Sequence, residues 1–199
     1  MKKLLIPIIV IIVIAGILYS VFAGSYNTAI TLQEDAKTAW SNVESAYQRR
    51  SDLIGNLVKT VQGAADFERT TLKEVIEARS KATSVNIDPS NITPAQMAQF
   101  QQAQSGLSSA LSRLLVTVER YPDLKANQNF LNLQTQLEGT ENRINVERNR
   151  YNTAVGEFNK FIKKFPNNIV LGLFGSFDEM TRFEAEEGTE KAPDVDFNF

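Results

Sequence analysis

Large apolar residues recur at every seventh position over a long stretch in the C-terminal half of this chain. The row reads Phe130, Leu137, Ile144, Tyr151, Phe158 and Phe165, and its companion row reads Leu133, Thr140, Glu147, Ala154 and Phe161. A sevenfold step keeps side chains on one face of an α-helix, whereas it alternates them between the two faces of a strand. The spacing therefore predicts a long amphipathic helix that closes at Phe165-Pro166.

An earlier stretch carries a similar pattern. One row reads Trp40, Tyr47, Ile54, Val61, Glu68 and Val75, and its companion reads Val43, Arg50, Leu57, Ala64, Thr71 and Ala78. No proline interrupts the chain from Tyr26 to Ala82, and the register runs unbroken across Gly55. We therefore expect one helix here, with a bend at Gly55 rather than a reversal of the chain.

A third helix is expected between these two. Thr93-Pro94-Ala95-Gln96 has the form of an N-terminal capping box with proline at the first helical position. The helix should end at Arg120 or Tyr121, because a residue before proline avoids helical geometry. We interpret "ERYPDLKANQNF", residues 119–130, as the corner that makes its two flanking helices antiparallel neighbours.

The N-terminus predicts a membrane anchor. The run from Leu4 to Phe22 is apolar and uncharged after Lys2 and Lys3, and roughly 20 such residues cross a bilayer. A cleavable signal peptide with its exit at residues 21–23 is the alternative, although the run is longer than a usual signal core. The flanking lysines predict a cytoplasmic N-terminus and a bundle that faces the periplasm or exterior.

The composition removes many kinds of site. The chain has no cysteine and no histidine, and its formal charge is −2. Thiolate chemistry, lipoprotein acylation and histidine-based metal sites or catalytic triads are therefore excluded. We expect no enzyme activity, metal or cofactor. Nucleic acid is not expected as a partner, because no basic stripe with interleaved aromatic residues is present.

These patterns predict an all-α protein, with an N-terminal transmembrane helix followed by an elongated antiparallel three- to four-helix bundle. We expect a stub and anchor at residues 1–24, the bundle at 25–166, an apolar C-terminal strap at 167–183 and an acidic flexible tail at 184–199. The tail has six acids against one lysine.

Charged residues that interrupt the apolar rows are the first candidate site. We expect Arg50 and Arg148 to pair with Glu68 and Glu147, because an unpaired buried charge is costly. The purely structural interpretation is a buried or edge ion-pair network. Two sharper ones stay open, namely a polar pocket or oligomer-register device and a carboxylate catalytic pair.

The segment "NNIVLGLFGSF" is the second candidate site. It is too short to cross a bilayer and is either a strap over the end of the bundle or a patch for a membrane surface or partner. Its large apolar members are Ile169, Val170, Leu171, Leu173, Phe174 and Phe177. Lys163 and Lys164 precede it and are placed to touch lipid headgroups.

Several strings resemble the LemA family of bacterial membrane proteins. They are "AWSNVESAYQRRSDLIGNLVKTVQGAADFE" from Ala39, "VERYPDLKANQNFLNLQTQLEGTENRINVERNRYN" from Val118, "FNKFIKKFP" from Phe158, and the later "FGSF" and "VDF". The resemblance implies a helical bundle behind one membrane helix and carries no catalytic residues. Family members usually have proline where this chain has Gly55.

The family also suggests partners. One relative acts in magnetosome membrane formation, and LemA-like proteins are often encoded near membrane proteases or TPM-domain proteins. We therefore expect a non-enzymatic scaffold in the bacterial cytoplasmic membrane that contacts lipid and either forms a homo-oligomer or binds an envelope protein. The alternative is an extracytoplasmic sensor module whose helix packing responds to a ligand.

Overall fold

The computed structural model describes residues 2–63, 67–173 and 177–184, and all regular structure among them is helical. The helices are α1 (Lys2–Gln62), α2 (Arg69–Ser84), α3 (Pro94–Val118), α4 (Pro122–Lys125), α5 (Gln128–Lys163) and α6 (Asn167–Gly172). The predicted all-α architecture, an apolar N-terminal helix followed by a helical bundle, is confirmed.

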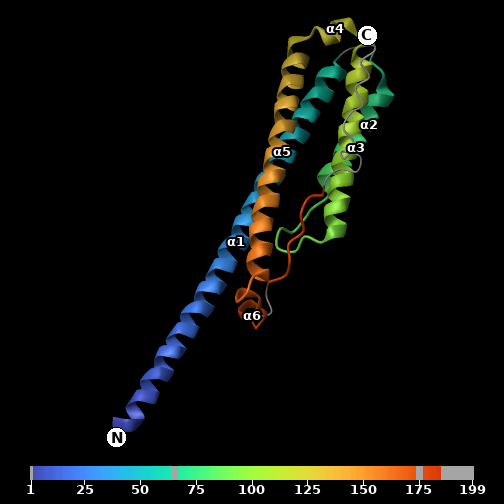
Figure 1. Cartoon of the computed structure of the whole chain (residues 1–199). Coiled ribbons are helices and arrows are strands. Elements are labelled where there is room, and N and C mark those ends of the chain that lie inside the picture. The colour runs from blue at the N-terminus through green and yellow to red at the C-terminus, as the bar shows by residue number, and fades with distance from the viewer. Residues whose placement is uncertain (1, 64–66, 174–176, 185–199) are drawn as a thin grey trace, which may run out of the picture.

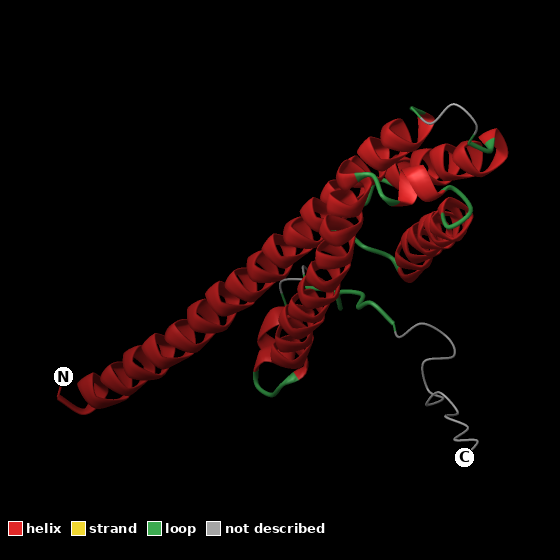
Figure 2. Cartoon of the chain, turned by 90° about the horizontal axis from the view of Figure 1, so that it is seen from above, coloured by secondary structure: helices red, strands yellow, loops and turns green. Residues whose placement is uncertain are grey.

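One helix is both the apolar N-terminal segment and a member of the bundle. α1 has 61 residues and would be about 90 Å long. Its first part projects alone from the other helices (Figures 1 and 2), and its large side chains from Ile8 to Leu18 are about half exposed. By length and composition α1 contains a segment able to cross a membrane, with a mean hydropathy of 2.6.

The long helices of the bundle alternate in direction. α1 rises to the end farthest from the N-terminus, α2 descends, α3 rises to α4, and α5 descends again (Figure 1). The predicted reversal at this corner is confirmed, because α3 and α5 run antiparallel on either side of α4, but the prediction that these two helices are each other's neighbours is wrong. α5 packs chiefly along α1, and α3 packs chiefly against α2. The two sevenfold rows thus meet each other, since the most regular apolar faces bury each other best.

The expectation of one helix through residue 82 is wrong. α1 continues through Gly55 to Gln62, and the chain then reverses, so that α2 returns beside α1. The glycine serves close packing. A Cβ built at Gly55 would lie 3.2 Å from the Arg79 Cζ of α2. Arg79 Nε donates to the Ser51 carbonyl at 2.8 Å and to the Ser51 hydroxyl at 3.0 Å.

The helix ends largely follow the predicted signals. The Thr93 hydroxyl accepts from the Gln96 backbone N–H at 3.2 Å, and Gln96 Oε1 accepts from the Thr93 N–H at 3.0 Å. The predicted capping box is therefore confirmed, although α3 ends slightly early, at Val118. At the corner, Asn127 Oδ1 accepts from the N–H groups of Asn129 and Phe130 and starts α5.

Most of the sevenfold rows form the core. All five row members from Phe130 to Phe158 are buried, as are the four from Trp40 to Val61. Trp40 is fully buried and stacks on Phe183 with ring centroids 5.7 Å apart, while Tyr151 packs edge-on at 5.3 Å. Phe165 departs from the prediction, because it lies beyond the end of α5 and is 78% exposed.

Candidate functional site

A short helix with an exposed apolar face lies at the end of the bundle from which the free part of α1 emerges (Figure 1). This helix, α6, buries Val170 and Leu171 against the bundle, whereas Ile169 is 57% and Leu173 is 70% exposed. Phe165 lies just before α6 and is also exposed. We call Phe165, Ile169 and Leu173 the apolar patch. Three large apolar side chains are thus left uncovered at one end of the molecule.

Contacts with α1 fix the position of α6. The buried Ser25 hydroxyl donates to Asn167 Oδ1 at 2.9 Å, and Asn167 Nδ2 donates to the Phe161 carbonyl at 3.2 Å. The rings of Tyr26 and Phe177 pack edge-on with centroids 5.6 Å apart. Leu171 joins a small core cluster with Ala29, Phe158 and Ile162. α6 is therefore held beside the first residues of α1 that follow the apolar run.

The structure divides the predicted patch residues into two groups. Val170 and Leu171 face the bundle, which is what a strap requires. Ile169 and Leu173 face outward, as a membrane or partner surface requires. Phe177 is half-buried, and Phe174 lies outside the described residues. The sevenfold pattern placed Phe165 in the buried row, and the prediction therefore did not include it in the patch. Its position before proline nevertheless signals that the helix has ended.

Charged residues of both signs lie near the patch residues in the sequence. Lys163 Nζ lies 2.7 Å from Glu179 Oε2, so this lysine is already paired with an acid of the same end. Lys160, Lys164 and Asp178 are exposed nearby in the sequence. The local balance is close to neutral, and the patch is therefore distinguished by its apolar surface rather than by charge.

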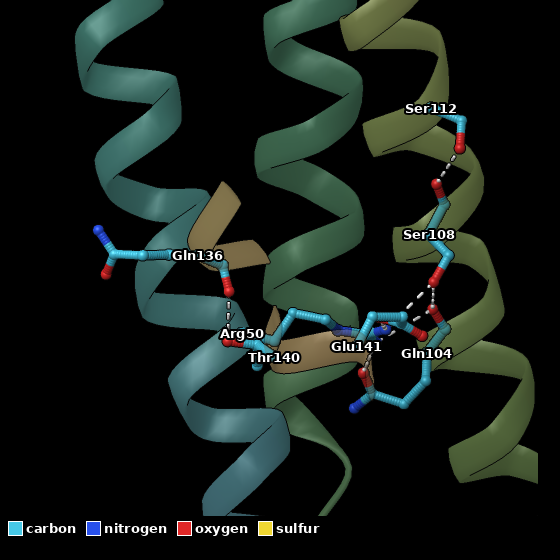
Figure 3. A network of polar contacts seen from close by, with 7 residues as sticks. All are labelled: Arg50, Gln104, Ser108, Ser112, Gln136, Thr140 and Glu141. Carbon is cyan, nitrogen blue, oxygen red and sulfur yellow. Dashed lines mark hydrogen bonds and ion pairs between the residues drawn. The ribbon is translucent and has the colours of Figure 1, made fainter. Parts of the chain in front are cut away.

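The second candidate site centres on Arg50, which is only 3% exposed. Its Nη1 donates to Ser108 Oγ at 3.2 Å and to Glu141 Oε2 at 3.0 Å, and its Nη2 donates to Gln104 Oε1 at 2.5 Å (Figure 3). Gln104 Nε2 in turn donates to the Ala82 carbonyl at 3.3 Å. Glu141 is half exposed, so the site is an edge ion pair that ties α1, α3 and α5 together.

The four predicted network residues do not come together. Arg50 pairs with Glu141 rather than with Glu68 or Glu147. Glu68 precedes α2 at the far end of the bundle, where it pairs with the exposed Arg120 at 3.2 Å. The predicted pairing is wrong because it assumed one helix through residue 68, whereas the chain reverses before it. A sevenfold row alone cannot report that reversal.

Glu147 and Arg148 have separate partners. Glu147 is 3% exposed, and its carboxylate accepts from Arg150 Nη1 at 3.1 and 3.3 Å, with Arg143 at 3.9 Å. The Arg148 guanidinium lies over the Phe183 ring, 4.8 Å from its centroid. The carboxylate of Glu147 is thus paired with arginines of α5, and the guanidinium of Arg148 contacts the C-terminal segment.

A small pocket opens beside Arg50, between α1, α3 and α5, with a volume of about 320 Å³. Its exposed surface is mainly apolar, and its polar lining residues are Arg50, Ser108, Ser112, Gln134, Glu138 and Glu141. The aliphatic residues are Ile54, Leu111, Leu115 and Leu137. Arg50 Nε has no hydrogen-bond partner among the described residues. The arrangement resembles a small-molecule pocket in having largely apolar walls and a few polar groups, among them one guanidinium and two carboxylates.

A wider cleft of about 1100 Å³ lies along α1 and is lined by Glu44, Arg49, Asp52, Asn86 and Arg143, among others. Partial burial raises the pKa of Glu44, and the Trp40 indole one turn away opposes this shift. The indole Nε1 nevertheless meets no hydrogen-bond geometry with any described residue. Within the described ranges, no three acidic side chains gather as metal ligands.

The extended segment 177–184 is fastened to α5 by two asparagines seven residues apart. Asn159 Nδ2 donates to the Met180 carbonyl at 2.8 Å, and Asn159 Oδ1 accepts from the Met180 N–H at 2.9 Å. Asn152 bonds Phe183 in the same reciprocal way at 3.1 and 2.8 Å. Sequence reasoning missed this device, whose only signal is the sevenfold spacing of two asparagines.

Tyr151 adds a further attachment. Its hydroxyl donates to the Thr181 carbonyl at 2.8 Å. Burial raises the pKa of the Tyr151 phenol well above its usual range, so the hydroxyl keeps its proton and stays a donor. The C-terminal segment is thus part of the bundle and carries Phe183 into the aromatic core.

Comparisons with known proteins give one consistent result. The model of the LemA family matches residues 39–197. Protein LemA of Metamycoplasma hominis is 28% identical over 180 residues, which cover 90% of this chain and 78% of that protein. Magnetosome proteins MamQ 1 and MamQ 2 of Paramagnetospirillum magneticum are each 28% identical over 169 residues, which cover 75% of this chain.

The match to the magnetosome proteins is partial in one respect. The chain covers 61% of the length of MamQ 1 and of MamQ 2. None of the names of these relatives denotes an enzyme.

Proposed function

This chain belongs to the LemA family, and from that premise we propose that it is a membrane-anchored, non-enzymatic scaffold of the bacterial envelope. Its bundle binds another membrane or periplasmic protein, or a second copy of itself. The span of α1 lies in the cytoplasmic membrane with Lys2 and Lys3 on the cytoplasmic side, following the positive-inside rule. The bundle then faces the periplasm or exterior.

The single observation that supports this proposal is the continuity of α1. The apolar segment and the bundle's longest helix are one helix, Lys2–Gln62, with no break between them. A bundle attached in this way cannot swivel freely, because the helix is unbroken across the joint. The Gly24-Ser25 pair at the joint is of a kind that often kinks helices, but Ser25 is fixed there by its hydrogen bond to Asn167 of α6. Any surface of the bundle is then presented at a fixed height above the membrane, which is what a scaffold requires.

The relatives support the choice of partner. Two of them are named magnetosome proteins, which favours a role in organising a membrane. The family resemblance adds membrane proteases and TPM-domain proteins as partner classes. Among these, a membrane protein is the best candidate, because α1 confines the bundle to the membrane surface.

Crosslinking in native membranes, followed by mass spectrometry, tests the proposal. The full chain has no cysteine, so a photoactivatable label attached to one introduced cysteine reports from one chosen site. Val116→Cys and Val146→Cys suit this purpose, because both side chains are exposed on the bundle. We expect one recurrent envelope protein, or a second copy, crosslinked at one of these sites. Exclusively monomeric chains at both sites, in membranes at native expression, would contradict the scaffold.

The pocket beside Arg50 favours one alternative, an extracytoplasmic sensor. A ligand with a cationic head and a short apolar tail fits this pocket, because two carboxylates, Glu138 and Glu141, lie beside aliphatic walls and outnumber the guanidinium, and α1 would carry a change of packing to the membrane. Hexylamine is a suitable probe, with methylamine as the control that lacks the tail. Thermal stabilisation by hexylamine but not methylamine, lost in Glu138→Gln, would favour the sensor over the scaffold.

A further inference from the structure

We propose that the apolar patch of Phe165, Ile169 and Leu173 inserts into the interfacial layer of the membrane that α1 spans. α6 then makes a second contact with lipid, beside the span, and the bundle is held by two points instead of one. This inference goes beyond the scaffold proposal, because it concerns how the bundle sits on the bilayer and not what the bundle binds.

The height of α6 along α1 supports this placement. The apolar run ends at Phe22, and Ser25, which bonds Asn167 of α6, follows three residues later. Three residues advance a helix by about 4.5 Å. The headgroup region extends roughly 5–8 Å beyond the hydrocarbon core on each side. If the run fills the hydrocarbon core, α6 lies within the headgroup layer.

The exposed surface has the character of an interfacial contact. The opposite face of α6 is already used, since Val170 and Leu171 are buried in the bundle. Ile169 and Leu173, one turn apart, remain exposed on a helix that bonds α1 three residues beyond the end of the apolar run. Tyr26 and Phe177 lie at the same level, where aromatic side chains are typical of membrane interfaces. Lipid is therefore the occupant that the neighbouring groups favour.

The surrounding charges define the kind of lipid contact. Lys163 is paired with Glu179, and Asp178 is exposed beside them. Local charge is too balanced to depend on an acidic membrane surface, which attracts clusters of basic residues. Insertion should therefore depend on the apolar side chains and occur in zwitterionic bilayers.

Spin labels on the full chain test the proposal. Ile169→Cys and Leu173→Cys, made separately and labelled, are reconstituted into nanodiscs of phosphatidylcholine that contain one copy each. Power saturation measures access to oxygen, which concentrates in lipid, and to a water-soluble nickel chelate. Val116→Cys, 72% exposed on α3, is the aqueous control, and Tyr19→Cys, 76% exposed on the span, is the lipid control.

We expect the oxygen-to-nickel accessibility ratio at residues 169 and 173 to be several-fold higher than at residue 116, and to approach that at residue 19. Circular dichroism of each labelled variant should match the unmodified chain, because both side chains are exposed. A ratio equal to that at residue 116 would overturn the proposal. So would a high ratio found only after phosphatidylglycerol is added, since charge and not the patch would then make the contact.

A protein occupant gives a different signature. If the patch instead binds a second copy, residues 169 and 173 should be aqueous in single-copy nanodiscs and become inaccessible to both reagents in crowded proteoliposomes. That outcome would overturn the lipid contact and leave the scaffold proposal standing, so the two proposals fail separately.

Discussion

Arg50 and Glu147 each occupy a buried position within rows of mostly apolar side chains, and both are 3% exposed. The chain stabilises them differently. Arg50 reaches across to α3 and α5, whereas Glu147 accepts hydrogen bonds from Arg150 on its own helix. Of these two residues, only Arg50 joins separate helices, and we therefore expect it to contribute more than Glu147 to the stability of the bundle.

Substitution of Arg50 tests this difference. Arg50→Met keeps the apolar stem but leaves the buried Gln104 side chain without its donor, and we expect it to lower the free energy of unfolding by about 2 kcal/mol. Glu141→Gln is the matched variant on the other side of the pair. Since Glu141 is half exposed, we expect it to cost less than about 1 kcal/mol. Urea unfolding in detergent, followed by circular dichroism, measures both, and a larger loss in Glu141→Gln would reverse our assignment.

Gly55 gives a second prediction for single residues. Replacing an exposed helical glycine by alanine stabilises a helix by roughly 0.5–1 kcal/mol. At Gly55 we expect a smaller gain, because the new Cβ meets the Arg79 guanidinium at 3.2 Å. When Arg79 is also replaced by alanine, the full gain should return.

Gly139 of α5 is the matched control, because a Cβ there meets nothing within 4 Å. Gly139→Ala should give the same gain with or without Arg79. The two glycines are then compared in a double-mutant cycle by urea unfolding. Equal gains at Gly55 in both backgrounds would show that Arg79 does not need the space.

Among the elements, the C-terminal segment depends most on side chains that a periodicity analysis ignores. Asn152 and Asn159 present an amide donor and acceptor to Phe183 and Met180, much as a neighbouring strand would. Because these bonds involve part-buried groups, their backbone N–H groups should be protected from solvent exchange.

Hydrogen exchange resolves the two attachments. We expect Asn152→Ala to accelerate exchange at the Phe183 amide with a much smaller change at Met180, and Asn159→Ala to do the opposite. The sole tryptophan, Trp40, stacks on Phe183, so its fluorescence should change in Asn152→Ala. Unchanged exchange at both amides in both variants would show that packing of Phe183 alone holds the segment.

The elements also show what the sequence could predict. The rows from Trp40 to Val61 and from Phe130 to Phe158, and the capping box at Thr93, follow from local spacing and were predicted correctly. The reversal after Gln62 was missed, because Val75 happens to continue the sevenfold register of α1. Partners of Arg50 were missed for a related reason. Pairing across helices depends on rotation and height, which spacing within one helix does not contain.

The candidate site was predictable to a similar extent. An apolar segment after Pro166 was evident, but which of its side chains face outward depends on α6 packing against Ala29 and Phe158. Composition could not separate the buried Leu171 from the exposed Leu173. Phe165 matched the apolar row and still became exposed, because α5 ends two residues earlier.

At the scale of the whole molecule, the continuous helix α1 sets the distance between the membrane and the bundle. Every bundle residue has a height set by the number of helical residues between it and the span. α6, which carries Ile169 of the apolar patch, lies at the end of the bundle nearest the span and bonds Ser25 through Asn167, and α4 lies at the opposite end (Figure 1). If α1 is rigid, changing its length below Ser25 must move the whole bundle without altering any bundle contact.

An insertion of seven alanines after Phe22 tests whether the length of α1 sets the height of the bundle above the membrane. It preserves the sevenfold register and the Ser25–Asn167 hydrogen bond, and it raises the bundle by about 10 Å. We expect a spin label at residue 173 to lose its lipid accessibility and match the aqueous control at residue 116. The same insertion placed after Lys3, on the other side of the apolar run, is the control and should leave the label in lipid. If residue 173 stays accessible to lipid after the first insertion, the bundle must tilt toward the membrane to keep α6 in contact with it. The joint near Phe22 would then be flexible, and the fixed height of the bundle above the membrane, on which the scaffold proposal depends, would be wrong.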